Sequence, residues 1–377
     1  MKKLVTMLIT VIAALALCFA FAGCSEPQPE AQEKFTTDYF VFTKNAVAST
    51  SATYTVSPTE KGREQQKLSV PGEIYGYKVT AVNPSAFKDS RTLKEITIGH
   101  GINTIGENAF NGCTALTSVT FPDTMVYLKA NAFRNCTNLQ SITLTDGIRG
   151  IEEYAFEGCT ALTNVTLPAS LKMIASYVFS GTNIRAITIP EGIKKIGAYA
   201  FYACKELQNV SLPASLTAID TYAFSSCSSL TEILFPRNES LKLGAYAFAQ
   251  SALTKVYLPS NVILGEYTFM KLAWDDSVAN PGEPGSPGLS GCTAIYYESP
   301  EGDIGTNAFG YTWNRPDLGF RIYIPTGSMS YYSNLRDGDG SWYRCVVNSV
   351  NSQGGQYNVL QEYDIAEVFP DGFPVAK

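Results

Sequence analysis

The 377-residue sequence has few of the residues that most enzymes rely on. It contains a single histidine, His100, which would have to serve any Ser-His-Asp or Cys-His chemistry, and no Asp or Cys motif stands near it in sequence. It has no phosphate loop, no H-E-x-x-H motif and no dinucleotide fingerprint. Paired carboxylates for glycoside hydrolysis have no fixed sequence pattern and stay open. We predict that the protein is not an enzyme, with no catalytic residues, no metal and no cofactor.

Charge is also scarce, and positive charge most of all. Charged residues make up 16% of the chain, below the usual quarter, and 28 Lys and Arg face 34 Asp and Glu, a net charge of −6. An acidic chain argues against nucleic acid as a partner and against a polybasic grip on anionic lipid. Aromatic residues are plentiful, with 22 Tyr and 20 Phe, so the sequence predicts a folded protein with much apolar surface to bury.

The N-terminus predicts export. Two lysines precede an uncharged, mostly apolar stretch at residues 4–22, which is typical of a secretory signal. The stretch ends in Phe21-Ala22-Gly23-Cys24, which resembles a bacterial lipobox, so we expect Cys24 to carry the lipid that holds the protein on a membrane. The alternatives are lipidation at Cys18, where Leu17 is too large, and ordinary secretion. Loss of residues 1–23 removes two lysines and no acid, so the net charge falls from −6 to −8.

A repeat of about 23 residues dominates the sequence. Phe87, Phe110, Phe133, Phe156 and Phe179 are each 23 residues apart, and further Phe residues continue the series to Phe309. Each has an aliphatic residue five positions earlier, and most follow an alanine. A fixed period of this length predicts a solenoid, because one coil cannot bury its apolar side alone. In most units a short strand of the form Leu-x-x-Val-x-Leu or Phe ends at a proline, which cannot donate to the ladder.

The repeated pattern "IGxxAFxxCxxLxxVxLP" resembles the BspA-like leucine-rich repeats of bacterial and protist surface proteins. The resemblance covers residues 79–325 and implies a leucine-rich-repeat solenoid, mainly β with short strands, turns and little helix, capped at both ends. It also implies an exported protein displayed on the surface of a bacterial cell envelope, and some such proteins are adhesins toward host proteins or other cells.

Two further segments complete the predicted organisation. A Pro-, Gly- and Ser-rich stretch at 270–291 predicts a surface loop inserted into the solenoid, and Pro370–Lys377 is expected to be a frayed tail. In chain order we predict a lipoprotein signal peptide at 1–23, a tether at 24–35, an N-terminal cap at 36–78, the solenoid at 79–325 and a C-terminal cap and tail at 326–377.

A solenoid turns equivalent positions into columns, and two columns have both a structural and a functional interpretation. One is a cysteine column, for which we favour buried free thiols over disulfides or zinc, because no C-x-x-C pair occurs; its members are Cys113, Cys136, Cys159, Cys204, Cys227 and Cys292, with Thr182 and Ser251 in two coils. The other is a tyrosine column that either grips glycans or peptides or stacks on itself and shields the coil edge; its members are Tyr154, Tyr177, Tyr199, Tyr222, Tyr246 and Tyr267.

The column on the outer face of the strands changes character along the chain. Six small hydroxyl residues, at 97, 120, 143, 166, 188 and 211, are followed by four large apolar or aromatic ones, and tyrosine is enriched at binding hot spots. We therefore predict a partner-binding surface made of Leu234, Tyr257, Tyr296 and Tyr323, flanked by Lys255 and Arg321. The alternative is that the insertion at 270–291 folds back and covers these side chains.

One weaker motif and three functions remain to be weighed. The stretch "RDGDGSW" at 336–342 begins like a calcium loop but has no closing glutamate, so we favour a plain Gly-rich turn. We predict a surface lipoprotein whose scaffold binds a protein ligand on host or neighbouring cells. The alternatives are a carbohydrate-binding surface lipoprotein and a structural spacer of the envelope.

Overall fold

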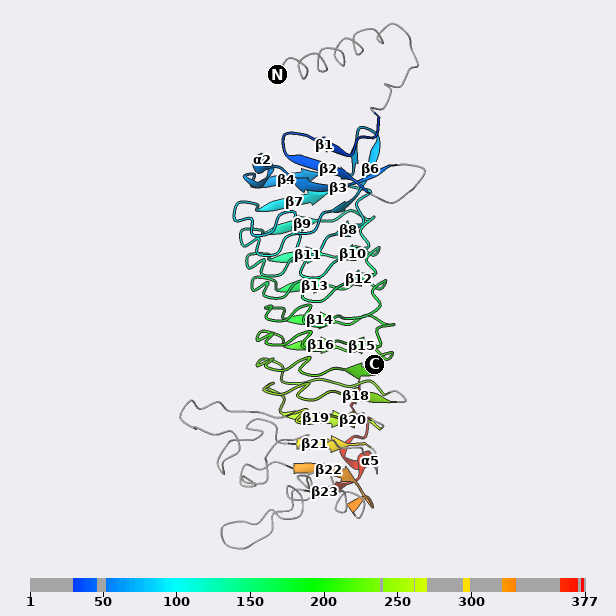
Figure 1. Ribbon diagram of the computed structural model, residues 1–377. Coiled ribbons are helices and arrows are strands. Elements are labelled where there is room, and N and C mark those ends of the chain that lie inside the picture. Colours follow the sequence, from blue (N-terminus) through cyan, green and yellow to red (C-terminus); the bar gives the residue numbers. More distant parts are fainter. Residues whose placement is uncertain are drawn as a thin grey trace, which may run out of the picture.

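The computed structural model describes residues 30–45, 52–237, 240–260, 262–269, 294–298, 321–329, 360–371 and 374–375. Over these ranges the chain forms a stack of coils, with two strand ladders running along it (Figure 1). The two helices whose bounds the structure gives are single turns, α2 (Glu60–Arg63) and α5 (Ile365–Val368). The predicted solenoid, rich in short strands and poor in helix, is confirmed.

The first ladder, which we call the front ladder, contains the strands that end at the repeated prolines. Its neighbouring strands run parallel with equivalent repeat positions opposite each other, as in the pair Ile96 and Val119. In β7 and β9 the inward side chains are buried and those between them point outward, which is the alternation of a β-strand. The strands are β4 (Lys67–Val70), β7 (Glu95–Ile98), β9 (Ser118–Thr120), β11 (Ser141–Thr143), β13 (Asn164–Thr166), β14 (Ala186–Thr188), β16 (Asn209–Ser211), β19 (Lys255–Leu258), β21 (Ala294–Tyr297), β22 (Arg321–Pro325) and β23 (Leu360–Tyr363).

The second ladder, the side ladder, uses the aliphatic residue that lies five positions before each phenylalanine. Its parallel strands are β6 (Tyr77–Val82), β8 (Thr104–Ile105), β10 (Tyr127–Leu128), β12 (Gly150–Ile151), β15 (Lys195–Ile196), β17 (Ala218–Ile219), β18 (Leu241–Leu243) and β20 (Val262–Leu264). At the N-terminal end the pairing becomes antiparallel, in the strands β1 (Lys34–Thr36), β2 (Phe40–Lys44), β3 (Thr53–Pro58) and β5 (Glu73–Ile74).

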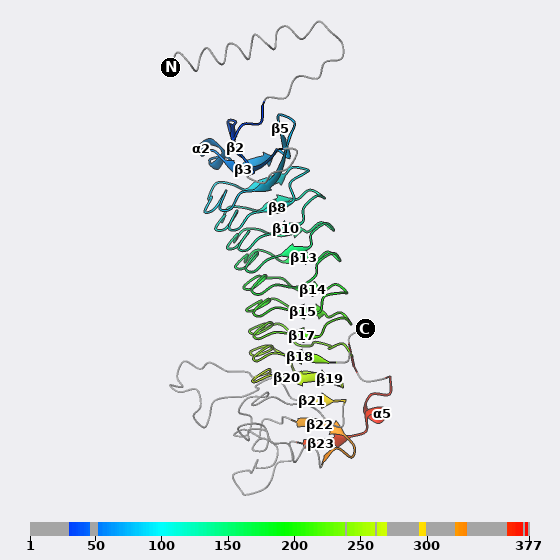
Figure 2. The ribbon, with the colours of Figure 1, turned by 45° about the vertical axis from the view of Figure 1, so that its right-hand side comes forward.

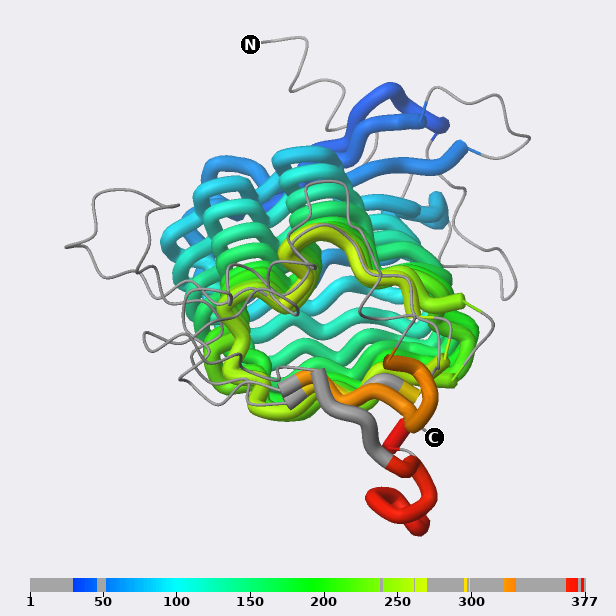
Figure 3. The backbone as a smooth tube through the Cα atoms, turned by 90° about the horizontal axis from the view of Figure 1, so that it is seen from below, coloured from blue at the N-terminus to red at the C-terminus, as the bar shows by residue number. Residues whose placement is uncertain are grey.

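The phenylalanines form one continuous stack through the interior. Phe110 and Phe133 are fully buried, and their ring centroids lie 5.0 Å apart with nearly parallel planes. The backbone N–H of Phe110 donates to the carbonyl of Ala132 in the next coil at 2.8 Å, and Phe133 donates to Ala155 in the same way. Figure 3, which looks along the stack, shows the coils superposed around this shared core. Each coil is therefore held to the next by both ring packing and main-chain hydrogen bonds.

The ladders reach beyond the predicted repeat region in both directions. β4 pairs in parallel with β7, and β23 pairs in parallel with β22 after the last strand recognised in the sequence. Cys24, the signal peptide, the insertion at 270–291 and the 336–342 motif lie outside the described residues. The division into cap, solenoid and tail stays a prediction.

Candidate functional site

The outer face of the front ladder has two chemically different halves. The hydroxyl side chains are exposed in every coil from Thr97 to Ser211. Leu234 then joins the same column through a parallel bridge to Tyr257, and both side chains are half-buried. The predicted change from small hydroxyls to large apolar groups therefore occurs on one face. Figure 2 shows the strands of this face stacked one above another.

Three tyrosines at the C-terminal end form what we call the tyrosine ladder: Tyr257, Tyr296 and Tyr323. Their rings stack face to face, with centroids 5.4 Å apart between Tyr257 and Tyr296 and 4.5 Å apart between Tyr296 and Tyr323. Strand register places them directly opposite one another on β19, β21 and β22. Burial raises the pKa of Tyr257 and of Tyr296 above the ordinary tyrosine value, so both hydroxyls stay protonated at neutral pH.

A phenylalanine from the C-terminal tail packs against this ladder. Phe369 meets Tyr257 edge-on, with centroids 5.7 Å apart, and meets Tyr296 edge-on at 5.4 Å. Edge-to-face contact is a preferred arrangement of aromatic rings, because the positive ring edge faces the negative ring surface. The C-terminal tail therefore covers part of the tyrosine ladder, a contact that the sequence did not predict.

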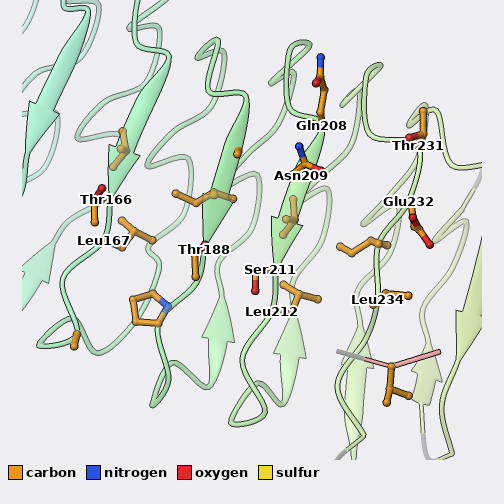
Figure 4. A pocket seen from close by; sticks show the side chains of 18 residues that line it. Thr166, Leu167, Thr188, Gln208, Asn209, Ser211, Leu212, Thr231, Glu232 and Leu234 are labelled. Carbon is orange, nitrogen blue, oxygen red and sulfur yellow. The ribbon is translucent and has the colours of Figure 1, made fainter. Parts of the chain in front are cut away.

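Beside the tyrosine ladder lies a groove of about 810 Å³ on the same face. Figure 4 shows Thr188 and Ser211 on its strands, Gln208 and Thr231 toward one side, and Leu234 at the end nearer the tyrosines. Val375 of the tail also lines the groove. The expectation of a frayed tail after Pro370 stays a prediction.

The charged residues of the predicted surface are less informative. Lys255 opens β19 and is exposed, in agreement with a flanking position. Arg321 opens β22, and its side chain lies outside the described part of the structure. Near the ends of these strands Arg237 forms an ion pair with Glu298, whose carboxylate also accepts from the backbone N–H of Ser260 at 2.9 Å. This pair joins two coils that lie on either side of the coil of β19, next to the tyrosine ladder.

The separate tyrosine column stacks on itself, as one of its two interpretations predicted. From Tyr154 to Tyr267 adjacent rings lie 4.5–4.9 Å apart and nearly parallel. Its residues have positive φ, near 60° in Tyr154, a conformation that asparagine adopts at Asn108 and Asn131 in earlier coils. Because each ring face covers the next, the interior of the stack offers no free ring face to a sugar.

The cysteine column consists of buried free thiols in all five described members. Each sulfur donates to the carbonyl of the phenylalanine in the preceding coil, as Cys113 does to Phe87 at 3.0 Å. Burial raises the pKa of Cys113 to about 12 and that of Cys204 to about 11, so these thiols are neutral and poor nucleophiles. Thr182 takes the same buried position with its hydroxyl bonded to Phe179. The preference for buried thiols is confirmed, and Cys292 lies outside the described residues.

The histidine lies at the surface. His100 is largely exposed, and its Nε2 lies 3.4 Å from Asp123 Oδ1, a carboxylate that is equally exposed. This contact was not expected from the sequence, because the two residues belong to adjacent coils. Across the described ranges no group of three His, Cys, Asp or Glu could hold a metal ion. No helix among the described residues has the length and apolar character needed to cross a membrane.

The fold and the columns define a leucine-rich-repeat solenoid, and the comparisons name its type. A family model described as "BspA type Leucine rich repeat region" matches six copies at residues 80–205 and 150–273, more than half of the chain. The protein therefore belongs to the family of BspA-type leucine-rich-repeat proteins. A comparison with curated proteins gave no match.

A comparison with solved structures found similar leucine-rich-repeat proteins. A leucine-rich repeat protein from Bacteroides ovatus is 23% identical over 80% of this chain and 75% of its own, with a TM-score of 0.50. The Treponema pallidum leucine-rich repeat protein is 26% identical over 50% of this chain and 87% of its own, with a TM-score of 0.46. A leucine-rich cell surface protein from Faecalibacterium prausnitzii is 20% identical over 92% and 99%, with a TM-score of 0.44.

Proposed function

We propose that the protein is an exported surface lipoprotein whose front ladder binds a protein partner on a host or neighbouring cell. The observation that carries this proposal is the apolar end of the outer face. There, Leu234 and the tyrosine ladder take the place of the small hydroxyls of the earlier coils. The pairing of the strands does not require large side chains on this outer face. Tyrosine supplies a large, rigid contact area with a polar tip, which suits a protein interface.

The scaffold supports this use. Inward positions are fixed by the shared core, so outward positions can vary from coil to coil without loss of the fold. The acidic net charge supports a protein rather than a nucleic acid as the partner. The sequence Phe21-Ala22-Gly23-Cys24 supports a lipid anchor on the cell envelope, from which the solenoid would project.

Replacing the three tyrosines of the ladder by alanine in one chain is expected to abolish partner capture while changing the melting temperature little. The side chains point outward, so their loss removes contact area and leaves the core intact. The measurement is capture of surface-labelled host proteins by the purified chain. A matched control replaces Thr97, Thr120 and Thr143, which occupy the same column in the hydroxyl half and do not line the groove. Capture that survives in the tyrosine variant, or is lost equally in the control, would remove the proposal.

The Cys24→Ser variant is expected to lose its lipid and to leave the membrane fraction. The thioether that holds the acyl chains can form only at the cysteine sulfur, and serine offers none. Metabolic labelling with an alkyne fatty acid in a bacterial host measures the attachment, and Cys18→Ser is the matched control. Labelling that persists in Cys24→Ser and disappears in Cys18→Ser would show that the lipid is attached to Cys18 and would contradict the prediction.

A further inference from the structure

The outer face of the front ladder holds a segment of its own chain at two points. Phe369 packs edge-on against Tyr257 and Tyr296, and Val375 lines the groove that also contains Leu234. The tail, red in Figure 1, turns back from β23 toward the middle coils instead of continuing past the end of the stack. The two contacts lie six residues apart, a span of up to about 20 Å in an extended chain. That span is enough to cross several coils at about 4.8 Å each.

A short helix directs the tail onto the face. The carboxylate of Asp364 accepts from the backbone N–H groups of Ala366 and Glu367 at 2.8 and 3.2 Å and so begins α5. The helix ends at Phe369, whose N–H donates to the carbonyl of Ile365 at 2.9 Å, and Pro370 prevents its continuation. The aromatic ring is thus presented at the point where the chain leaves the helix.

The chemistry of the tail matches the chemistry of the face beneath it. The ring of Phe369 lies on the aromatic part, and Val375 lines the groove that Ser211 and Leu234 also line. The sequence of the tail repeats a Phe-Pro pair, at Phe369-Pro370 and again four residues later. Pro370 and Asp371 form a turn directly after Phe369. Proline fixes its own φ and so reduces the conformational entropy that the segment loses on binding.

We propose that this face is a groove for a peptide in which a Phe-Pro pair is followed by a small aliphatic residue, and that Phe369 and Val375 of the tail are its resident occupants. The inference rests on the proposed use of the face for binding and names the kind of segment that it takes. An outside partner reaches the tyrosine ladder by presenting a segment of the same chemistry and displacing the tail. The tail thereby sets a threshold for binding, because a tethered competitor acts at a high effective concentration.

The test measures binding of a fluorescent peptide with the sequence of residues 364–377 to the full chain. The comparison is between the unmodified chain and a Phe369→Ala, Val375→Asp chain, whose tail has lost both contacts. We expect the peptide to bind the modified chain at least roughly ten-fold more tightly, since millimolar effective concentrations are typical of short tethers. Adding Tyr296→Ala to the modified chain should remove this binding, and a peptide carrying the Phe369→Ala and Val375→Asp changes should bind neither chain.

Equal affinity of the peptide for the unmodified and modified chains would overturn the inference, as would binding that ignores Tyr296→Ala. Circular dichroism and melting temperature show that each variant is folded, and the changes concern surface side chains. The experiment contains no outside partner, so its result is independent of the capture experiment above. A failed capture with successful peptide binding would reject the proposed cellular partner and keep the groove.

Discussion

The Phe156→Ala variant is expected to lose about 3–5 kcal/mol of unfolding free energy, the usual cost of removing a large buried aromatic side chain. Phe156 is fully buried in the middle of the stack, with ring centroids 5.5 Å from Phe133 and 5.6 Å from Phe179. Alanine leaves a cavity that the two neighbouring rings cannot fill, because each is held in its own coil by main-chain hydrogen bonds.

Chemical denaturation followed by circular dichroism measures this loss. The matched controls are Phe156→Leu, which keeps much of the volume and should cost less, and Thr166→Ala, which removes an exposed side chain and should change stability by less than about 0.5 kcal/mol. A loss of unfolding free energy below about 1 kcal/mol in Phe156→Ala would contradict the conclusion that the continuous stack of phenylalanines stabilises the fold.

Excision of one whole period, residues 134–156, is expected to give a folded protein that is one coil shorter. The deletion joins Phe133 to Glu157, which restores the local sequence found after Phe156. In the intact protein the N–H of Phe156 donates to the carbonyl of Val178 at 2.9 Å. After the excision, the N–H of Phe133 can donate to the same carbonyl. Because each coil contacts only its neighbours, removal of a full period leaves one new interface that resembles the old ones.

Removal of residues 134–145 alone, about half a period, should instead destroy the cooperative fold. It brings a turn opposite a strand and moves the inward residues of every later coil out of register with the earlier ones. Small-angle scattering and thermal unfolding separate the two deletions: the full excision should shorten the particle by about 4.8 Å and keep a sharp transition. Equal damage from both deletions would contradict a modular stack.

The sequence by itself determined the coil and its interior. The constant spacing of Phe87, Phe110 and Phe133 predicted stacked coils that share one core, and the structure places adjacent rings of this series 5.0 Å apart. The same reasoning predicted the buried thiols and the self-stacked tyrosine column. In a parallel stack, equivalent positions of adjacent coils lie directly opposite each other, so a one-dimensional period is also a three-dimensional contact map. Asn108 and Asn131 also signalled the positive φ of the tyrosine column, although that signal was missed.

Only the tertiary structure decided what covers the outer face. Phe369 and Val375 lie outside the periodic part of the sequence, so no spacing relates them to Tyr257, Tyr296 or Leu234. The two Phe-Pro pairs in the short tail were the available sign that it contacts another part of the protein. They do not indicate in which direction the chain runs after the last coil. Whether such a tail continues past the last coil or turns back over the earlier ones depends on the short helix that precedes it. A repeat period carries no information about a segment that occurs once.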